Sequence, residues 1–62
     1  MSAHDEIALT AISQKYLALS NGRLNTPEGM RARHIADDAQ KMIDYRLTLA
    51  QFLKLWPEVE LK

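Results

Sequence analysis

The sequence predicts an all-α fold, an antiparallel hairpin of a short and a long helix that associates with a second copy of itself. Apolar residues recur every three or four positions in two long segments, which is the period of one helix face. Turn-forming residues gather in a single place, at Ser20–Gly22 and Asn25–Pro27. The alternation of apolar and polar residues that indicates a half-buried strand is absent.

The first helix is expected over residues 3–20. Ser2 followed by Asp5 resembles a capping box, and the acids of the first turn suit the positive end of the helix dipole. The helix should end near Ser20, because Gly22 can adopt the left-handed conformation that follows a last helical turn. One apolar stripe lies between these ends: Leu9, Ile12, Tyr16 and Leu19.

A turn over residues 21–26 leads into a second helix, expected over residues 27–55. Thr26 is a suitable N-cap, and Pro27 suits the first helical position, where its missing N–H has no partner to lose. No helix breaker follows before Pro57, so a single helix and a short C-terminal tail are expected. Its apolar stripe, interrupted by Arg46, contains Ala32, Ile35, Ala39, Met42, Leu49, Leu53 and Trp56.

The different lengths of the two helices predict where the chain associates. At 1.5 Å per residue the first helix is about 27 Å long and the second about 43 Å, so the end of the second helix extends past the first. The apolar arc on this overhang is rotated by roughly 100° from the face that packs on the first helix. If the second helix instead breaks near Arg46, the overhang would fold back onto the hairpin. We expect the self-association interface to consist of Tyr45, Leu49, Phe52, Leu53 and Trp56.

Composition also favours oligomerisation. The chain has 62 residues and no cysteine, with 8 Lys+Arg against 8 Asp+Glu. In so short a chain the gain from apolar burial barely balances the loss of chain entropy, and disulfides and thiolate metal sites are excluded as supplements. Zero net charge gives no long-range attraction to nucleic acid or to an anionic membrane. The acidic N-terminus is not a signal peptide and no membrane span occurs, so a cytoplasmic location is expected.

Residues for catalysis or metal binding do not gather in the sequence. His4 and His34 fall at opposite ends of the predicted hairpin. His34 with Asp37 and Asp38 would offer only two metal ligands on one helix face. Hydroxyl side chains are present without a convergent base, and a glycine-rich phosphate loop is missing. The sequence therefore predicts a protein that is not an enzyme and needs no cofactor or metal.

A basic cluster is predicted around the turn and the start of the second helix. Glu28 is the only acid within it. Such a cluster can contact phosphates, but three aspartates follow it and no aromatic residue interleaves with it, as a single-strand binder would require. A solvated helix start is therefore the favoured interpretation, and a nucleic-acid or partner contact is the alternative. The cluster consists of Arg23, Arg31, Arg33 and His34.

The segment Asn25-Thr26-Pro27-Glu28-Gly29-Met30-Arg31-Ala32-Arg33-His34, after a short first helix, resembles the small all-helical proteins encoded in the exo–xis early region of lambdoid phages. The resemblance covers the whole chain through its size and overall character. It implies a self-associating helical hairpin that acts through contacts with host or phage proteins on the choice between lytic and lysogenic development. The group has no motif from which functional residues can be transferred.

The sequence thus predicts a small self-associating interaction or regulatory module. Two alternatives remain open: a nucleic-acid-binding regulator that uses the arginine cluster, and a structural subunit of a larger complex. The salt dependence of binding distinguishes the nucleic-acid alternative from a protein–protein interaction. Affinity for phosphates falls steeply as the salt concentration rises, whereas the affinity of an apolar protein contact changes little. A structural subunit purified alone would aggregate or stay partly unfolded.

Overall fold

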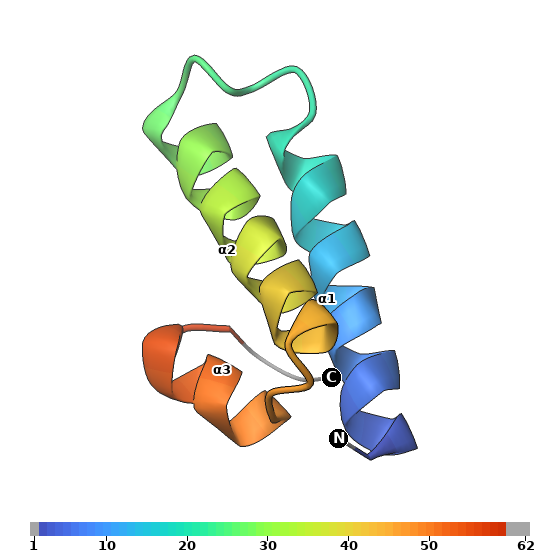
Figure 1. Ribbon diagram of the computed structural model, residues 1–62. Helices are drawn as coiled ribbons and strands as arrows, with labels where there is room; N and C mark the ends of the chain where they lie inside the picture. The colour runs from blue at the N-terminus through green and yellow to red at the C-terminus, as the bar shows by residue number, and fades with distance from the viewer. Residues whose placement is uncertain (1, 60–62) are drawn as a thin grey trace.

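The computed structural model describes residues 2–59, and within this range it contains three helices and no strand. They are α1 (Ala3–Ser20), α2 (Pro27–Asp44) and α3 (Leu49–Leu55). α1 and α2 lie side by side as an antiparallel hairpin, and α3 lies against the end of the hairpin opposite the connecting turn (Figure 1). The predicted all-α hairpin is therefore confirmed, with a third helix added to it.

The predicted limits of α1 and the predicted start of α2 are confirmed. The Ser2 hydroxyl accepts a hydrogen bond of 3.1 Å from the N–H of Asp5 at the start of α1. Gly22 follows α1 with a φ of 75°, in the left-handed region. The Thr26 hydroxyl accepts a hydrogen bond of 3.1 Å from the N–H of Gly29, with proline in the first turn of α2. These local signals act as expected because each satisfies backbone groups that a helix end leaves without partners.

The prediction of one continuous helix over residues 27–55 is wrong, because α2 ends at Asp44. Arg46 has a φ of 57°, and its N–H donates to the carbonyl of Ile43 at 3.2 Å. The N–H of Leu47 donates to the carbonyl of Met42 at 2.8 Å. This pair of bonds around a left-handed residue is a Schellman motif, which ends a helix and redirects the chain. The apolar C-terminal segment thereby returns to the hairpin and is buried there instead of projecting into solvent.

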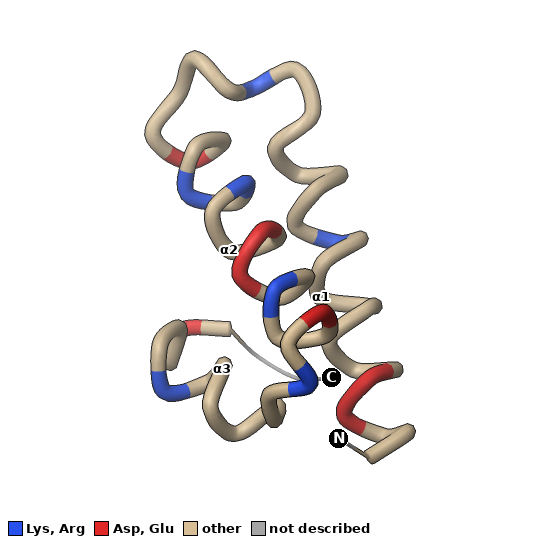
Figure 2. Tube along the Cα trace, viewed as in Figure 1, with Lys and Arg blue, Asp and Glu red and all other residues tan. Residues whose placement is uncertain are grey.

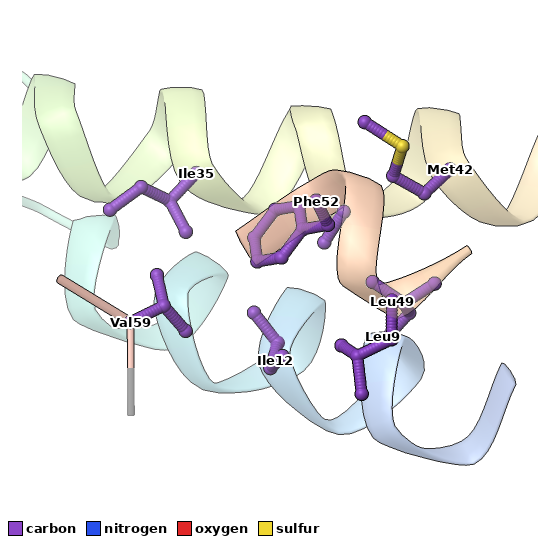
Figure 3. Packing of buried hydrophobic residues seen from close by; sticks show 8 residues of the cluster. Leu9, Ile12, Ile35, Met42, Leu49, Phe52 and Val59 are labelled. Atoms are coloured by element: carbon purple, nitrogen blue, oxygen red, sulfur yellow. The ribbon is translucent and has the colours of Figure 1, made fainter. Parts of the chain in front are cut away.

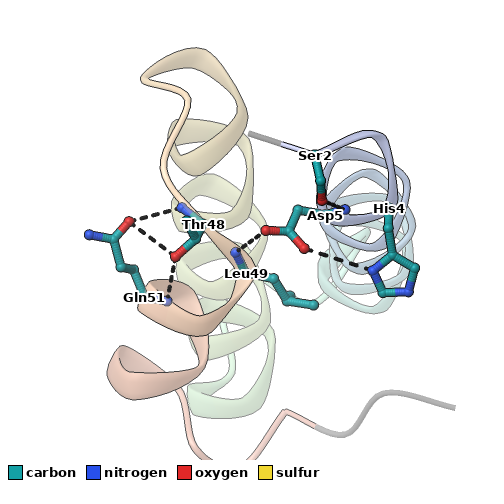
Figure 4. A network of polar contacts seen from close by, with 6 residues as sticks. All are labelled: Ser2, His4, Asp5, Thr48, Leu49 and Gln51. Carbon is teal, nitrogen blue, oxygen red and sulfur yellow. Dashed lines mark hydrogen bonds and ion pairs between the residues drawn. The ribbon is translucent and has the colours of Figure 1, made fainter.

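A second set of caps starts α3 four residues later. The Thr48 hydroxyl accepts from the N–H of Gln51 at 3.2 Å, and the Gln51 side chain accepts from the N–H of Thr48 at 2.9 Å. The carboxylate of Asp5, on α1, accepts from the N–H of Leu49 at 3.2 Å (Figure 4). A helix of 7 residues is too short to be stable alone, so these bonds and its packing hold it in place.

The core forms where α3 and the residues after it enter the groove between α1 and α2. Phe52 is completely buried and points into this groove, with Leu49 on one side and Val59 on the other (Figure 3). An aromatic side chain of this size removes more apolar surface from water than any other in the cluster. The cluster of buried residues consists of Leu9, Ile12, Ile35, Ala39, Met42, Leu49, Phe52 and Val59.

The turn between α1 and α2 packs tightly on the first turn of α2. The carbonyl of Arg23 accepts from the N–H of Thr26 at 3.0 Å and from its hydroxyl at 2.7 Å. A Cβ on Gly29 would lie 1.8 Å from that carbonyl oxygen, well inside any van der Waals contact. Glycine is therefore required at position 29 because the backbone of the turn occupies the space that a side chain would need.

Replacing Arg46 with glycine should stabilise the protein by about 1 kcal/mol, because a left-handed conformation costs a residue with a Cβ roughly 1–2 kcal/mol and costs glycine almost nothing. The free energy of unfolding from urea titration measures this gain. Arg46→Ala is the matched control, since alanine removes the same side chain and keeps the unfavourable φ. If Arg46→Gly were no more stable than Arg46→Ala, the residue at position 46 would not have the left-handed conformation described here.

Gly29→Ala should destabilise the protein by about 1–3 kcal/mol, because the new methyl group can be accommodated only if the turn backbone moves away from α2. Thermal unfolding followed by circular dichroism measures the change. Met30→Ala, at the exposed neighbouring position, should shift stability by less than about 0.5 kcal/mol. Equal stability of the two variants would show that the turn does not pack as described.

Candidate interaction surface

The structure does not place the predicted self-association residues on one exposed surface. Leu49 and Phe52 are buried in the core of the chain itself, and Leu53 and Trp56 are half-buried against it. Tyr45 alone is well exposed, just after α2. The expected surface required a continuous second helix, and the turn at Arg46 returns its apolar arc to the hairpin. Self-association itself stays a prediction.

Residues 56–59, which we call the C-terminal strap, are tied to α2 by polar contacts. The indole N–H of Trp56 donates to the carboxylate of Asp38 at 2.7 Å. The guanidinium of Arg31 lies 5.4 Å from the centre of the Trp56 ring and donates two hydrogen bonds to the carboxylate of Glu58, one of them from Nε at 2.7 Å. Val59 completes the strap by entering the core. Together these contacts fix the path of the chain beyond α3.

The contact between Arg31 and Glu58 shifts the pKa of both side chains. The hydrogen bond from Arg31 to the carboxylate lowers the pKa of Glu58, and the charge of Arg31 acts in the same direction. The bond to Glu58 correspondingly raises the pKa of Arg31. The two side chains are 57% and 43% exposed, so water and salt screen the pair and its contribution to stability is small.

The predicted basic cluster is not a contiguous patch of unpaired arginines in the described part of the chain. Arg31 is engaged with Glu58, and Arg33 donates to Asp37 on the next turn of α2 at 3.2 Å. His34 is exposed on the same helix. Basic and acidic positions follow one another along α2 (Figure 2). Among residues 2–59, no group of three potential ligands for a metal ion occurs.

Among the residues that the structure describes, a groove between α1 and α2 is open near the connecting turn, beyond the end that α3 and Val59 fill. We call it the open groove. Leu19, at its edge, is 45% exposed, while Ile35 is buried and belongs to the same cluster as Val59. The open groove is thus the continuation of the core groove toward the turn. It is lined by the apolar residues Tyr16, Leu19, Ala32 and Ile35, by Gly29, and by the charged residues Arg23, Glu28, Arg31 and Glu58.

A second hollow lies on another side of the same end of the hairpin. Leu17, which is 46% exposed, and Leu24 line it together with Arg33. At 100° per residue, positions 17 and 19 of α1 face nearly opposite directions, so the two hollows are separate surfaces. None of the residues that line the second hollow belongs to the buried cluster. The open groove is therefore the better candidate for a site where another apolar chain can dock.

The sequence places Tyr16 and Leu19 on the apolar stripe of the first helix, but it does not show that they line an open groove. It does not identify Glu58 either, because a pair between Arg31 and Glu58 joins residues 27 positions apart and leaves no local pattern. The only available signal was the coincidence of one arginine and one glutamate at the start of α2 and in the tail. Such coincidences are too common to identify a pair without the fold.

Comparison of this chain with protein-family models, with curated proteins and with solved structures gave no match. No helix within residues 2–59 is both long and apolar enough to cross a membrane.

Acidification should weaken the protein through Glu58. Because its pKa is lower in the folded state, the pair contributes stability above the ordinary carboxyl value of 4.5, and this contribution disappears as the pH falls through the lowered value. Glu58→Gln should reduce stability slightly at neutral pH and flatten the decrease below pH 4.5. Urea unfolding at several pH values measures both effects. In an Arg31→Gln background, Glu58→Gln should change neither the stability at neutral pH nor its decrease at acidic pH. If it still changed either of them, the pH dependence would not come from the pair.

Proposed function

We propose that this chain is a small non-enzymatic interaction module that binds an apolar segment of another protein in the open groove and also associates with a second copy of itself. One observation carries the proposal: within residues 2–59, α3 and the C-terminal strap fill the groove between α1 and α2 as far as Val59, and the groove continues from there toward the turn. The remaining length has an apolar floor and a charged rim. A groove already used by one helix of the chain is suited to a second helix of similar chemistry.

The lining of the open groove indicates the kind of partner. An amphipathic helix can place apolar residues three and four positions apart along such a floor. The rim carries charges of both signs, and among residues 2–59 neither Arg23 nor Glu28 forms an ion pair. A partner helix with flanking residues of both signs would match them. Such rim charges influence orientation and association rate more than affinity.

The sequence resemblance to early-region proteins of lambdoid phages supports a host or phage protein as the partner. The proposal therefore includes a regulatory role in the cytoplasm of an infected cell, in the choice between lytic and lysogenic development. It also includes self-association, which the short chain favours because burial between copies would add to a small core.

Nucleic-acid binding receives less support than protein binding. Arg31 and Arg33 would have to exchange carboxylate partners, Glu58 and Asp37, for phosphates. A structural subunit is also less favoured, since the chain closes its core with its own α3. Salt titration of any observed complex separates the nucleic-acid alternative from an apolar protein contact.

Leu19→Asp should abolish partner binding while the fold is kept, because the side chain is 45% exposed at the edge of the open groove. A charge there would have to be buried unpaired when a partner docks, which costs several kcal/mol. Affinity capture from host lysate, followed by isothermal titration with each purified candidate, measures the loss. Circular dichroism checks that helicity is unchanged.

Leu17→Asp is the matched control for this experiment. Leu17 has nearly the same exposure, 46%, on the same helix and lines the other hollow. A partner bound equally by the original chain and by Leu17→Asp, but not by Leu19→Asp, supports the proposal. A partner lost only with Leu17→Asp would move the binding site to the second hollow and overturn the assignment of the open groove.

A further inference from the structure

We propose that α3 is exchanged between two copies of the chain, so that α3 and the C-terminal strap of each copy fill the groove of the other. In the exchanged dimer the hinge at residues 45–48 is extended, and α2 and α3 no longer fold back on each other. This inference rests on the self-association part of the proposed function and gives it a mechanism. It does not depend on the partner of the open groove.

The hinge favours such an exchange. Arg46 adopts a φ of 57° in the closed chain, a conformation that residues with a Cβ avoid. The four hinge residues include neither glycine nor proline, so none of them adopts the left-handed conformation without cost. Opening the hinge therefore relieves an unfavourable backbone conformation. Short hinges under strain are those in which domain swapping occurs most readily.

The contacts that hold α3 and the strap on the hairpin can form equally well on the hairpin of a second copy. The N–H of Leu49 is bound by Asp5 on α1, and the indole of Trp56 is bound by Asp38 on α2. Phe52 is buried between the same two helices. Each of these contacts joins α3 or the strap to the hairpin, so the hairpin of a second copy offers an identical set. Exchange therefore loses only interactions within the hinge.

The hinge interactions set the balance between the two forms. The bonds of Leu47 to Met42 and of Arg46 to Ile43 stabilise the closed hinge, so the closed monomer is favoured at low protein concentration. Exchange is bimolecular, so the dimer grows with concentration. Tyr45, which is 71% exposed in the closed chain, lies at the hinge, where the two copies cross in the dimer. Its ring can then be covered by the hinge of the other copy.

The Arg31–Glu58 pair allows a direct test, because it joins the hairpin to the strap. In Arg31→Glu both positions are acidic, and in Glu58→Arg both are basic. Either variant alone faces like charges, whether closed or exchanged with its own kind. When the two variants are mixed, unfolded and refolded together, only an exchanged heterodimer restores two opposite-charge pairs. Native mass spectrometry separates the heterodimer from both homodimers.

The matched control uses the Arg33–Asp37 pair, which lies within α2. Mixing Arg33→Glu with Asp37→Arg gives the same opposite net charges without a pair that exchange can restore. We expect the ratio of heterodimer to homodimers to be roughly tenfold higher for the strap pair than for the α2 pair, because two exposed like-charge contacts become attractive. The double variant Arg31→Glu/Glu58→Arg should return to the behaviour of the original chain.

The hinge provides a second measurement. Arg46→Gly should shift the equilibrium between the open and the closed hinge about fivefold toward the closed form in each copy. The dimer contains two hinges, so its dissociation constant should rise by roughly 25-fold, whereas Arg46→Ala should not raise it. Sedimentation over a dilution series gives these constants. If dimers form but the ratio of heterodimer to homodimers is the same for the strap pair and the α2 pair, the exchange is wrong and self-association occurs by another route. A chain that stays monomeric at every concentration would overturn both.

Discussion

The burial of Phe52 between α1 and α2 is the contact on which the rest of the structure depends. α3 has only 7 residues and would not remain helical without it. Once Phe52 occupies the groove, the Leu49 N–H comes within reach of Asp5, and the strap is led back along α2 to Asp38 and Arg31. The polar contacts around α3 therefore depend on an apolar one, and they define its position more than they supply its stability.

The helix ends that depend on local chemistry could be predicted from the sequence. The caps at Ser2 and Thr26 and the left-handed Gly22 involve neighbouring backbone groups, so a few residues suffice to specify them. The end of α2 could not be found in this way. Arg46 carries no breaker signal, and its left-handed conformation is imposed because the following apolar residues are buried against α1 and α2. The spacing of Thr48 and Gln51 was the one local sign that a new helix begins there.

The candidate site was predicted less well than the fold, and the reason is geometric. The apolar arc around Phe52 was correctly identified as a surface in need of cover, but the pattern of a sequence does not show whether the cover comes from the same chain. Within residues 2–59 the open groove is the length that α3 does not fill, and the apolar residues of its floor do not differ by type from ordinary core residues. Arg31 illustrates the same difficulty: its pairing with Glu58 depends on the path of the strap, which follows from the turn at Arg46.

The environment of Trp56 gives the molecule an optical property. It is the only tryptophan in the chain, and its indole is held by Asp38 beneath the guanidinium of Arg31. The emission of an indole ring depends on its exposure to water and on nearby charges. Intrinsic fluorescence therefore reports on one event, the attachment of the strap to α2, without interference from other tryptophans. Loosening of the strap can thus be followed in the unlabelled protein, separately from the melting of the hairpin that far-ultraviolet circular dichroism records.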